Sequence, residues 1–408
     1  MSVDNMIPEI RFKGFSEAWK NKKIGGILSE IKRPIELMDN ESYQLVTVKR
    51  RNEGVVPRAV LKGKNILVKN YFSVKAGDYL ISKRQVVHGA NGIVPDNLDG
   101  AVVSNEYLVV TDSDDITARY WTVISIRPEM HKLFFVSSYG VDIEKLVFDV
   151  TDWKNRTIVI PQVTEQKNIT DYFQKLDELI NQHQHKYDKF RNIKKAMLEK
   201  MFPKQGETIP EIRFKGFSGE WEEKKIFDEA IVTTGYPFDS AEFSSSGDYL
   251  VITNGNIQNN SAVVDGKAGN RIASDKIACL SQYILNVGDI LITMDGSVGR
   301  TAKVIETRQI LAQRVGRLVA KNNTEFLYQS LNTGAFLEAM TTISHGGTIK
   351  HISLSEISNY ALLVPKNLEE QVKIGNYLKK LDDLIAQHQQ QITKLNNIKQ
   401  ACLSKMFV

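Results

Sequence analysis

The sequence predicts an α+β protein made of two tandem copies of one unit. We expect two α/β domains, related by a pseudo-twofold axis and separated by a long antiparallel two-helix coiled coil. Three observations predict this fold. They are a long helical segment that occurs twice, a short lead segment that occurs twice, and a body of mixed strand and helix patterns after each lead.

The long helix gives the strongest signal. The segment from Glu165 to Phe202 returns from Glu370 to Phe407, 205 residues later and without a gap. In both copies the apolar positions alternate at spacings of four and three, which is typical of a coiled-coil seam. At about 1.5 Å per residue each helix is roughly 57 Å long, so we interpret it as a spacer. The predicted seam residues are Ile169, Phe173, Leu176, Ile180, His183, Tyr187, Phe190, Ile374, Leu378, Leu381, Ile385, His388, Ile392 and Leu395.

A histidine lies near the middle of each seam, at His183 and His388. A metal site and a pH switch are two functional interpretations of this pair. The simpler interpretation, which we favour, is a polar seam residue that fixes the register, as a buried Asn does in other coiled coils. If the helices are antiparallel about a pseudo-twofold axis, the two imidazoles should meet at that axis.

A lead segment precedes each body. IPEIRFKGF occurs before Trp19 and again before Trp221, 202 residues later. Two long repeats indicate a duplication, because a solenoid needs several short ones. The repeats predict a first domain with its lead, a first spacer helix, a polar linker, a second domain with its lead, and a second spacer helix. Their predicted bounds are 1–161, 162–202, 203–208, 209–365 and 366–408.

The two bodies show similar strand and helix patterns. Runs rich in β-branched residues predict strands at 43–48, 79–82, 106–111, 157–160, 249–253, 289–293, 302–305 and 361–364. Helical patterns are predicted at 116–136, where Pro128 interrupts or restarts the helix, and at 325–331 and 335–342.

Polar residues collect where these strands end, and here the two bodies differ. Lys49 to Arg51 follow one strand, whereas Asn254 to Asn256 follow its counterpart. Arg can pair with guanine through two hydrogen bonds and Asn or Gln with adenine, while Lys holds phosphate. The predicted DNA contacts are Lys49, Arg50, Arg51, Lys83, Arg84, Gln85, His88, Asn254, Asn256, Asn259, Arg300, Gln313, Arg314, His345, Lys350 and His351. Neutral drift of exposed loops is the alternative explanation.

Composition and motifs exclude several classes of function. The net charge of +5 permits an anionic partner without requiring one. Cys279 and Cys402 are expected to be reduced core thiols, and no metal-ligand spacing is present. The sequence has no phosphate-binding loop, and DGSVG at 295–299 is interpreted as a turn. No apolar run is long enough for a membrane span, so we expect a cytoplasmic chain. Because these catalytic and ligand-binding motifs are missing, we also expect a non-catalytic chain without a metal or cofactor of its own.

The order of lead, body and helix, repeated twice, resembles the specificity subunits of type I restriction-modification systems. The most specific pieces are IRFKGF before both tryptophans, GDILIT at 288–293, SHGGTIKHIS from Ser344, and the EQ and LD-LI letters of both helices. The resemblance covers nearly the whole chain. The first body departs from the pattern, with GDYLISKR at 77–84 and SSYGVDIEK at 137–145.

The resemblance implies that each body is a target recognition domain that reads one half of a bipartite site in double-stranded DNA. It further implies a chain that docks two modification subunits and also restriction subunits. S-adenosylmethionine, ATP and Mg are then bound by those partners. Two alternatives stay open on the sequence alone: a two-headed coiled-coil scaffold for protein or glycan ligands, and an enzyme whose catalytic residues form no known motif.

Overall fold

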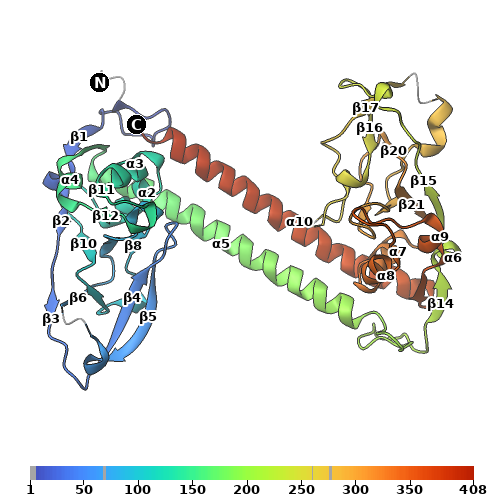
Figure 1. Ribbon diagram of the computed structural model, residues 1–408, viewed down its shortest axis with the longest axis horizontal. Coiled ribbons are helices and arrows are strands. Elements are labelled where there is room, and N and C mark those ends of the chain that lie inside the picture. Colours follow the sequence, from blue (N-terminus) through green and yellow to red (C-terminus); the bar gives the residue numbers. More distant parts are fainter. Residues whose placement is uncertain (1–5, 68–69, 260, 275–277) are drawn as a thin grey trace. The chain divides into compact units, whose positions relative to one another are not determined.

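The computed structural model describes residues 6–67, 70–259, 261–274 and 278–408. The chain forms two compact units. The first unit contains Met1–Gln182 and Gln391–Val408, and the second contains His183–Gln390. The long helices α5 (Val163–Lys200) and α10 (Leu368–Lys405) therefore each contribute residues to both units (Figure 1).

The body of the first unit contains two main sheets. A four-stranded sheet has the order β2-β10-β7-β8, with bounds Ser29–Glu30, Tyr107–Thr111, Tyr79–Ser82 and Asn91–Ile93. A five-stranded sheet has the order β3-β6-β9-β4-β5, with bounds Pro34–Ile35, Tyr71–Ser73, Val102–Ser104, Ser42–Val48 and Val55–Lys62. Two short pairs complete the strands, β1 (Lys20–Lys23) with β13 (Thr157–Ile160) and β11 (Ser138–Tyr139) with β12 (Val147–Phe148).

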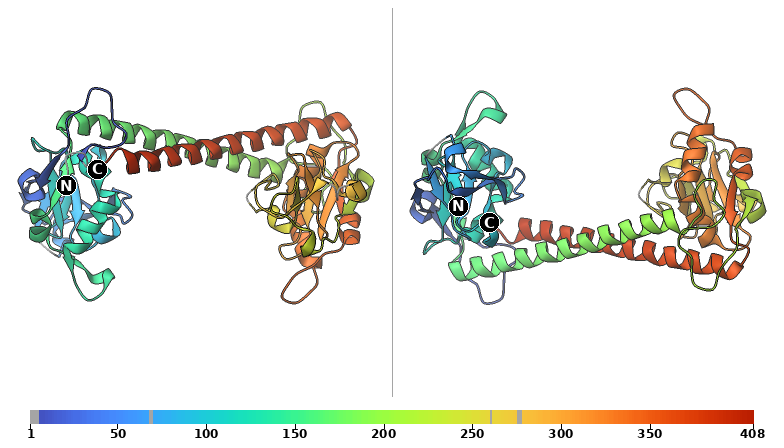
Figure 2. Two further views of the ribbon diagram at one scale, coloured as in Figure 1. Left: turned by 90° about the horizontal axis from the view of Figure 1, so that it is seen from above. Right: turned by 90° about the horizontal axis from the view of Figure 1, so that it is seen from below.

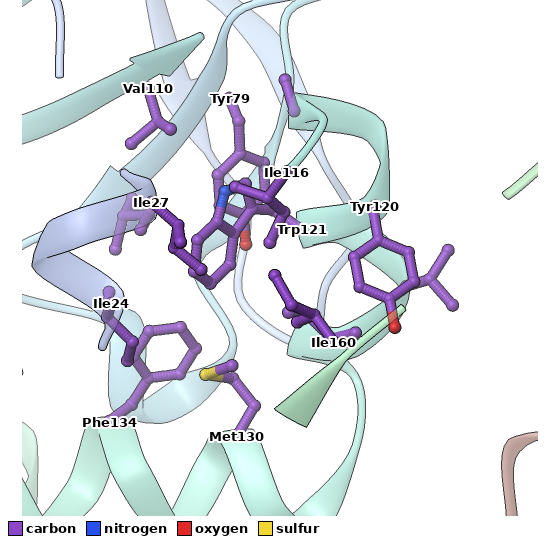
Figure 3. Close-up of a cluster of buried hydrophobic side chains, with 14 of the residues drawn as sticks. Ile24, Ile27, Tyr79, Val110, Ile116, Tyr120, Trp121, Met130, Phe134 and Ile160 are labelled. Atoms are coloured by element: carbon purple, nitrogen blue, oxygen red, sulfur yellow. The ribbon is translucent and has the colours of Figure 1, made fainter. Parts of the chain in front are cut away.

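Short helices cover the first sheet and close the core. They are α1 (Ile24–Ile27), α2 (Ala118–Ser125), α3 (Pro128–Val136) and α4 (Val150–Asn155). Pro128 begins α3, where its missing N–H costs nothing, so the predicted helical segment consists of two helices. Trp121, Tyr79 and Phe134 are among the largest fully buried side chains of this core (Figure 3). Burying such aromatic groups is the main favourable contribution to folding.

The second unit repeats this plan with fewer strands among its described residues. Its four-stranded sheet has the order β15-β21-β18-β19, with bounds Ala230–Thr234, Val315–Ala320, Ile290–Thr293 and Thr301–Lys303. A three-stranded sheet has the order β17-β16-β20, with bounds Arg271–Ile272, Tyr249–Ile252 and Gln309–Leu311. The remaining elements are β14 (Glu222–Lys225), β22 (Ala361–Val364), α6 (Ile226–Glu229), α7 (Thr324–Leu331), α8 (Ala335–Ile343) and α9 (Leu354–Asn359).

Most of the predicted strands and helices lie within two residues of their expected bounds, and 79–82, 157–160 and 361–364 match fully. The strand expected at 302–305 is instead β19 at Thr301–Lys303, so it begins one residue earlier and ends two residues earlier than expected. The sequence did not indicate β5, which forms a hairpin with β4 and contains Pro57. Its core-facing residues do not alternate regularly, so no period of two was visible.

Within each unit the two long helices run antiparallel. In the first unit Asp177 of α5 binds Lys399 at 2.5 Å, and Tyr172 contacts Cys402 at 3.5 Å, so rising numbers on one helix meet falling numbers on the other. Figure 2 shows the end of α10, in red, beside α5, in green, in this unit.

Gly375 lies inside α10 because the backbone of Phe326 approaches within 2.8 Å of the place where a Cβ would be.

No helix of the described residues is long and apolar enough to cross a membrane.

Candidate nucleic-acid interface

A buried ion pair attaches each lead to a long helix. In the first unit Arg11 donates two hydrogen bonds to Glu165, at 2.7 and 2.8 Å, and the Glu165 side chain is only 1% exposed. In the second unit Arg213 makes the same pair with Glu370, at 2.6 and 2.8 Å. The repeated RF and EQ letters thus encode one structural clasp. Such two-bond pairs fix orientation as well as distance.

The glutamine that follows each of these glutamates caps the end of the body. Gln166 donates to the carbonyl of Pro161 at 2.9 Å and accepts from the Thr117 backbone at 3.0 Å. Gln371 donates to the Pro365 carbonyl at 3.2 Å. Because these groups are buried, leaving them unpaired would be costly. The clasp and the cap together hold each body on its long helix.

Aromatic side chains close the opposite end of each helix. Phe407, after α10, lies edge-on against Trp19 with ring centroids 5.9 Å apart in the first unit. Phe202, after α5, makes the equivalent contact with Trp221 at 5.8 Å in the second unit. Each lead tryptophan therefore packs on the helix end contributed by the other copy of the repeat.

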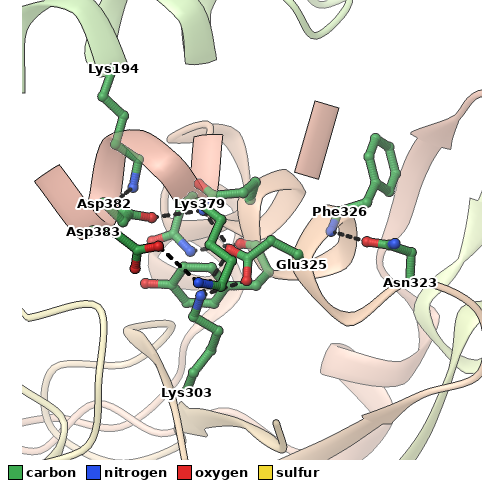
Figure 4. A network of polar contacts seen from close by, with 11 residues as sticks. Lys194, Lys303, Asn323, Glu325, Phe326, Lys379, Asp382 and Asp383 are labelled. Atoms are coloured by element: carbon green, nitrogen blue, oxygen red, sulfur yellow. Dashed lines mark hydrogen bonds and ion pairs between the residues drawn. The ribbon is translucent and has the colours of Figure 1, made fainter. Parts of the chain in front are cut away.

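The helix pair is also bonded to the second body. Lys194 of α5 pairs with Asp382 of α10 at 2.5 Å, and Asp382 accepts from Gln329 of α7 at 2.8 Å. Gln329 reaches Glu325, which binds Lys303 at 2.7 Å (Figure 4). This network ties both helices to α7 and β19. The Lys194 to Asp382 pair is the repeat equivalent of the Lys399 to Asp177 pair in the first unit.

The predicted seam residues fall into two groups. Those at the ends of the helix pair belong to the cores of the bodies, and those in the middle are partly exposed or buried between the two helices alone. The first group comprises Ile169, Phe173, Leu176 and Leu395 in the first unit and Phe190, Ile374, Leu378 and Leu381 in the second. The second group comprises Ile180, His183, Tyr187, Ile385, His388 and Ile392.

The two seam histidines meet, which confirms the expectation drawn from the repeat. The Nδ1 atoms of His183 and His388 are 2.9 Å apart, and Phe190 stacks on the His388 ring at 5.7 Å. A hydrogen bond between two imidazole nitrogens needs one donor and one acceptor, so at least one ring is neutral. Burial, the charge of His183 and the charge of Lys186 lower the pKa of His388. A register-fixing role for the pair stays a prediction.

We expect acidification to destabilise the helix pair at this point. Because the pKa of His388 is lower in the folded state, the folded state binds fewer protons than the unfolded state. Its stabilising contribution is therefore complete above the ordinary histidine pKa of about 6.5 and is lost as the pH falls below that value. Thermal unfolding from pH 8 to pH 5 measures this loss. A His183→Leu, His388→Leu variant should show a smaller loss, and an equal loss in both proteins would contradict the prediction.

In the first unit, the predicted DNA contacts lie on loops that converge. The backbone of Arg51, in the turn after β4, donates to the carbonyl of His88 at 2.7 Å, so the loops after β4 and β7 touch. Arg50 binds Glu144 at 2.7 Å, and the His88 ring lies 3.6 Å from the same carboxylate. Glu144 belongs to the loop between β11 and β12. Three loops therefore meet at one end of this body.

The other predicted contacts of the first unit lie beside this junction. Arg84 is 57% exposed and binds Glu106 at 2.8 Å. Lys83 donates to the carbonyl of Asn105 at 2.7 Å, and Lys49 lies 3.8 Å from Glu53. Gln85 is half-buried within the β7 to β8 loop.

The equivalent loops of the second unit converge around Asp295, in the DGSVG turn after β18. Asp295 accepts from Arg314 at 2.9 Å and pairs with Nδ1 of His351 at 2.5 Å. His345 exchanges two backbone hydrogen bonds with His351, and the two rings meet edge-on at 5.3 Å. The carbonyl of Lys350 accepts from the backbone of Gly296. This turn therefore docks on the loop that carries both histidines.

Four further predicted contacts of the second unit lie in two locations. Asn254 accepts from the Met294 backbone at 3.3 Å, beside the Asp295 cluster, and Gln313 is exposed next to Arg314. Asn259 and Arg300 instead line a cavity of about 330 Å³ next to α5, together with Arg191.

One predicted contact needs correction. Asn256 is 4% exposed, and its amide group bonds to the carbonyls of Asp265 and Ala268 and to Thr253. All of these partners belong to its own loop. The side chain therefore has no free edge for a base, and Asn256 shapes the loop after β16 instead.

The acidic members of these clusters, Glu106, Glu144 and Asp295, were not predicted as site residues from the sequence. A carboxylate in the sequence does not indicate a nucleic-acid partner. Each of the three carboxylates also lies far along the chain from the arginine that it binds. Backbone strain marks the same places. Arg51, Asn52 and Arg314 have φ angles of 60°, 56° and 66°, which are uncommon for residues other than glycine and are often found at functional sites.

Comparisons with known proteins agree with this geometry. A family model described as the type I restriction modification DNA specificity domain matches residues 218–397, which include most of the second body and its helix. The specificity subunit of the type I restriction enzyme MjaVIII from Methanocaldococcus jannaschii is 22% identical over 394 residues, covering 90% of this chain and 87% of that protein. The crystal structure of the S subunit of a type I restriction-modification system from M. genitalium has the same fold, with a TM-score of 0.66, 13% identity and 99% coverage of both chains.

The match to a DNA specificity domain and the internal repeat indicate a DNA-specificity protein with two copies of one recognition unit. The matched region is the second copy, and the first copy is its internal repeat. The second copy matches the type I restriction modification DNA specificity domain, and the chain as a whole is similar to a type I restriction-modification specificity subunit. It is accordingly a non-catalytic subunit, and none of these similarities supports a scaffold for protein or glycan ligands. Within the part of the chain that the structure describes, no group of three or more His, Cys, Asp or Glu side chains is placed to hold a metal ion.

Proposed function

We propose that this chain reads a bipartite site in double-stranded DNA for a type I restriction-modification complex, with one half-site for each body. The observation that carries the proposal is that loops converge in both units. In the first unit they are the loops after β4 and β7 and the loop between β11 and β12, and in the second unit they are the loops after β18 and β20 and the loop between α8 and α9. The framework is shared, but the residues on these loops differ. Such divergence on a common scaffold is expected of two readers with unlike ligands.

The chemistry of the loops suits base edges as well as phosphates. Arg50, Arg84 and Arg314 are 49%, 57% and 64% exposed, so their guanidinium groups are accessible. Arginine can donate two hydrogen bonds to guanine, while Lys350 and the loop amides can hold the DNA backbone. Their placement on the converging loops supports the assignment of these residues as DNA contacts, whereas Asn256, Asn259 and Arg300 lie outside the loop junctions.

The repeated lead supports docking of two copies of one partner, the modification subunit. Ile7 and Ile10 are 47% and 43% exposed in the first lead, and their equivalents Ile209 and Ile212 are 50% and 37% exposed. Apolar residues that stay exposed at matching positions are typical of a protein interface. In contrast to the recognition loops, this surface is the same in both copies, so one kind of partner fits both.

The finer division of labour follows from this assignment. The modification subunits would bind S-adenosylmethionine, and the restriction subunits would bind ATP and Mg, in the cytoplasm where the complex meets DNA. Domains at 1–161 and 209–365 would be the two readers, and the helices at 162–202 and 366–408 would be the spacers joined through the linker at 203–208.

Mapping the methylated sites of a genome in cells that express the complex tests the function. We expect Arg84→Ala to relax one position of one half-site, at a cost of about 1 to 3 kcal/mol in discrimination, because a two-bond contact to guanine is lost. The other half-site and the gap should not change. Arg58→Ala removes an exposed arginine from β5 and serves as the matched control. A methylated motif that is identical in the wild type and in Arg84→Ala contradicts the assignment of Arg84.

Binding of purified complex to DNA at several salt concentrations provides the second measurement. Each phosphate contact should contribute about −0.9 to the slope of log affinity against log salt concentration. A wild-type complex that neither methylates a bipartite motif nor binds duplex DNA with this salt dependence would contradict the proposed function.

A further inference from the structure

Carboxylates occupy both candidate interfaces, although DNA is a polyanion. Arg50 is bonded to Glu144, Arg84 to Glu106, and Arg314 to Asp295, at 2.7, 2.8 and 2.9 Å. A carboxylate near phosphates is repelled, so it weakens affinity for DNA in general. On a DNA-reading surface, an acidic side chain gains from contact only with a hydrogen-bond donor, and among the base edges those donors are few.

The pair of Asp295 and Arg314 is the best ordered of the three. One carboxylate oxygen of Asp295 accepts from Arg314, and the other is held by His351 at 2.5 Å. The Asp295 side chain is 15% exposed, whereas Arg314 is 64% exposed. Although partial burial opposes it, the hydrogen bonds from His351 and Arg314 lower the pKa of Asp295, so the carboxylate is ionised at neutral pH. The pair thus presents a fixed acceptor next to an accessible donor.

The backbone of Arg314 supports a role beyond structure. Its φ angle of 66° places a bulky residue in the left-handed region, which a glycine would occupy without strain. The carbonyl of the same residue accepts from Met294, in the turn that carries Asp295. Strain of this kind persists where the side chain must be held in one place.

The base pair that matches this arrangement is G·C. In the major groove guanine presents two acceptors, O6 and N7, and cytosine presents one donor, its N4 amino group. O6 and N4 are adjacent because they bond to each other within the base pair. Arginine takes the guanine acceptors, and a neighbouring carboxylate takes the cytosine donor. An A·T pair offers one acceptor on each base, adenine N7 and thymine O4, with the adenine N6 donor between them, so the arginine cannot bond to two acceptors of one base.

We propose that Asp295 and Arg314 act as one reader of a G·C base pair in the second half-site, with Arg314 donating to guanine and Asp295 accepting from cytosine N4. This inference rests on the proposed function. His351 stays bonded to Asp295 and positions it. The carboxylate has a second effect, because its charge opposes binding of the arginine to phosphates and so disfavours DNA that lacks the base pair.

Three variants of the full chain, each purified with its modification subunits, test the inference. Asp295→Asn keeps the shape of the side chain but loses its charge, and Arg314→Gly removes the guanidinium group while relieving the backbone strain. Glu306→Gln, at an exposed position of the second unit outside the cluster, gives the same change in net charge as Asp295→Asn and serves as the control. Each complex selects duplexes from a library randomised across both half-sites.

We expect the wild type and Glu306→Gln to require a G·C pair at one position of the second half-site. Both Asp295→Asn and Arg314→Gly should lower the preference for that pair at least about fivefold, with the first half-site unchanged. Asp295→Asn should also bind unrelated DNA more tightly than Glu306→Gln does. Because glycine is favoured at position 314, melting of Arg314→Gly at or above the wild-type temperature separates lost reading from lost folding.

Two outcomes overturn the inference. One is a wild-type second half-site without an invariant G·C pair, and the other is an unchanged preference in both cluster variants. In either case a bipartite motif would still be selected, so the proposed function would stand. A wild-type complex that selects no motif would instead contradict the proposed function, and the inference with it.

Discussion

Arg11→Ala should destabilise the first unit by roughly 3 to 5 kcal/mol, because it leaves the Glu165 carboxylate buried without its partner. Glu165 is 1% exposed and cannot turn to solvent without displacing the lead. The hydrogen bonds to Glu165 also raise the pKa of Arg11, which strengthens its preference for the charged form. Urea unfolding, monitored by hydrogen exchange of amides in the first unit, measures the loss of unfolding free energy.

The duplicated chain supplies the controls for this experiment. Arg213→Ala should produce a similar loss in the second unit, where Glu370 is also 1% exposed. Lys13→Ala removes an exposed charge from the same lead and should change stability by less than about 0.5 kcal/mol. A double variant, Arg11→Met with Glu165→Leu, should recover most of the stability, because no charge is then left buried. An Arg11→Ala protein as stable as Lys13→Ala would show that the clasp does not hold the lead.

Adding one heptad to both long helices should lengthen the tolerated gap of the DNA site by about 3 base pairs, since seven residues extend a helix by about 10.5 Å. The insertion duplicates residues 180–186 in α5 and their repeat equivalents 385–391 in α10. These segments surround the point where His183 and His388 meet, so the seam register is kept on both sides. The base sequences of the two half-sites should not change, because no recognition loop is altered. Methylation at the sites that the wild-type complex recognises should then be lost almost completely.

A heptad inserted into α5 alone is the matched control. It would separate Lys194 from Asp382 while leaving the Asp177 to Lys399 pair in place, so we expect loss of methylation at every site. Mapping the methylated sites in genomes of cells that express either insertion variant measures the gap length and the half-site sequences together. If the double insertion keeps the wild-type gap, the helices do not set the distance between the half-sites.

The duplicated framework was accessible from the sequence because it depends on local and periodic signals. The four-three spacing identified both long helices, and their exact repeat identified the two histidines as partners. Strands such as β7 and β22 were visible because short apolar runs with turn residues nearby are distinctive. Strands with irregular burial such as β5 were not.

The recognition loops were only partly accessible. Positions after framework strands could be predicted, because strand ends expose the polar residues that follow them. The list of predicted DNA contacts could not separate Asn256 from Arg314. The Asn256 amide is hydrogen-bonded within its own loop, whereas Arg314 is exposed. Nor could the list show that Arg300 lies apart from the Asp295 cluster, in a cavity that Arg191 also lines.

By itself, then, the sequence determined the duplication, the seam and the family, since these follow from repeats and spacings along one chain. Only the tertiary structure decided which charges meet. Glu144 reaches Arg50 and Asp295 reaches Arg314 and His351 across loops that the chain connects at a distance. The physical reason is that a helix seam is set by neighbours three and four residues apart, whereas a loop cluster is set by the sheet on which its members end.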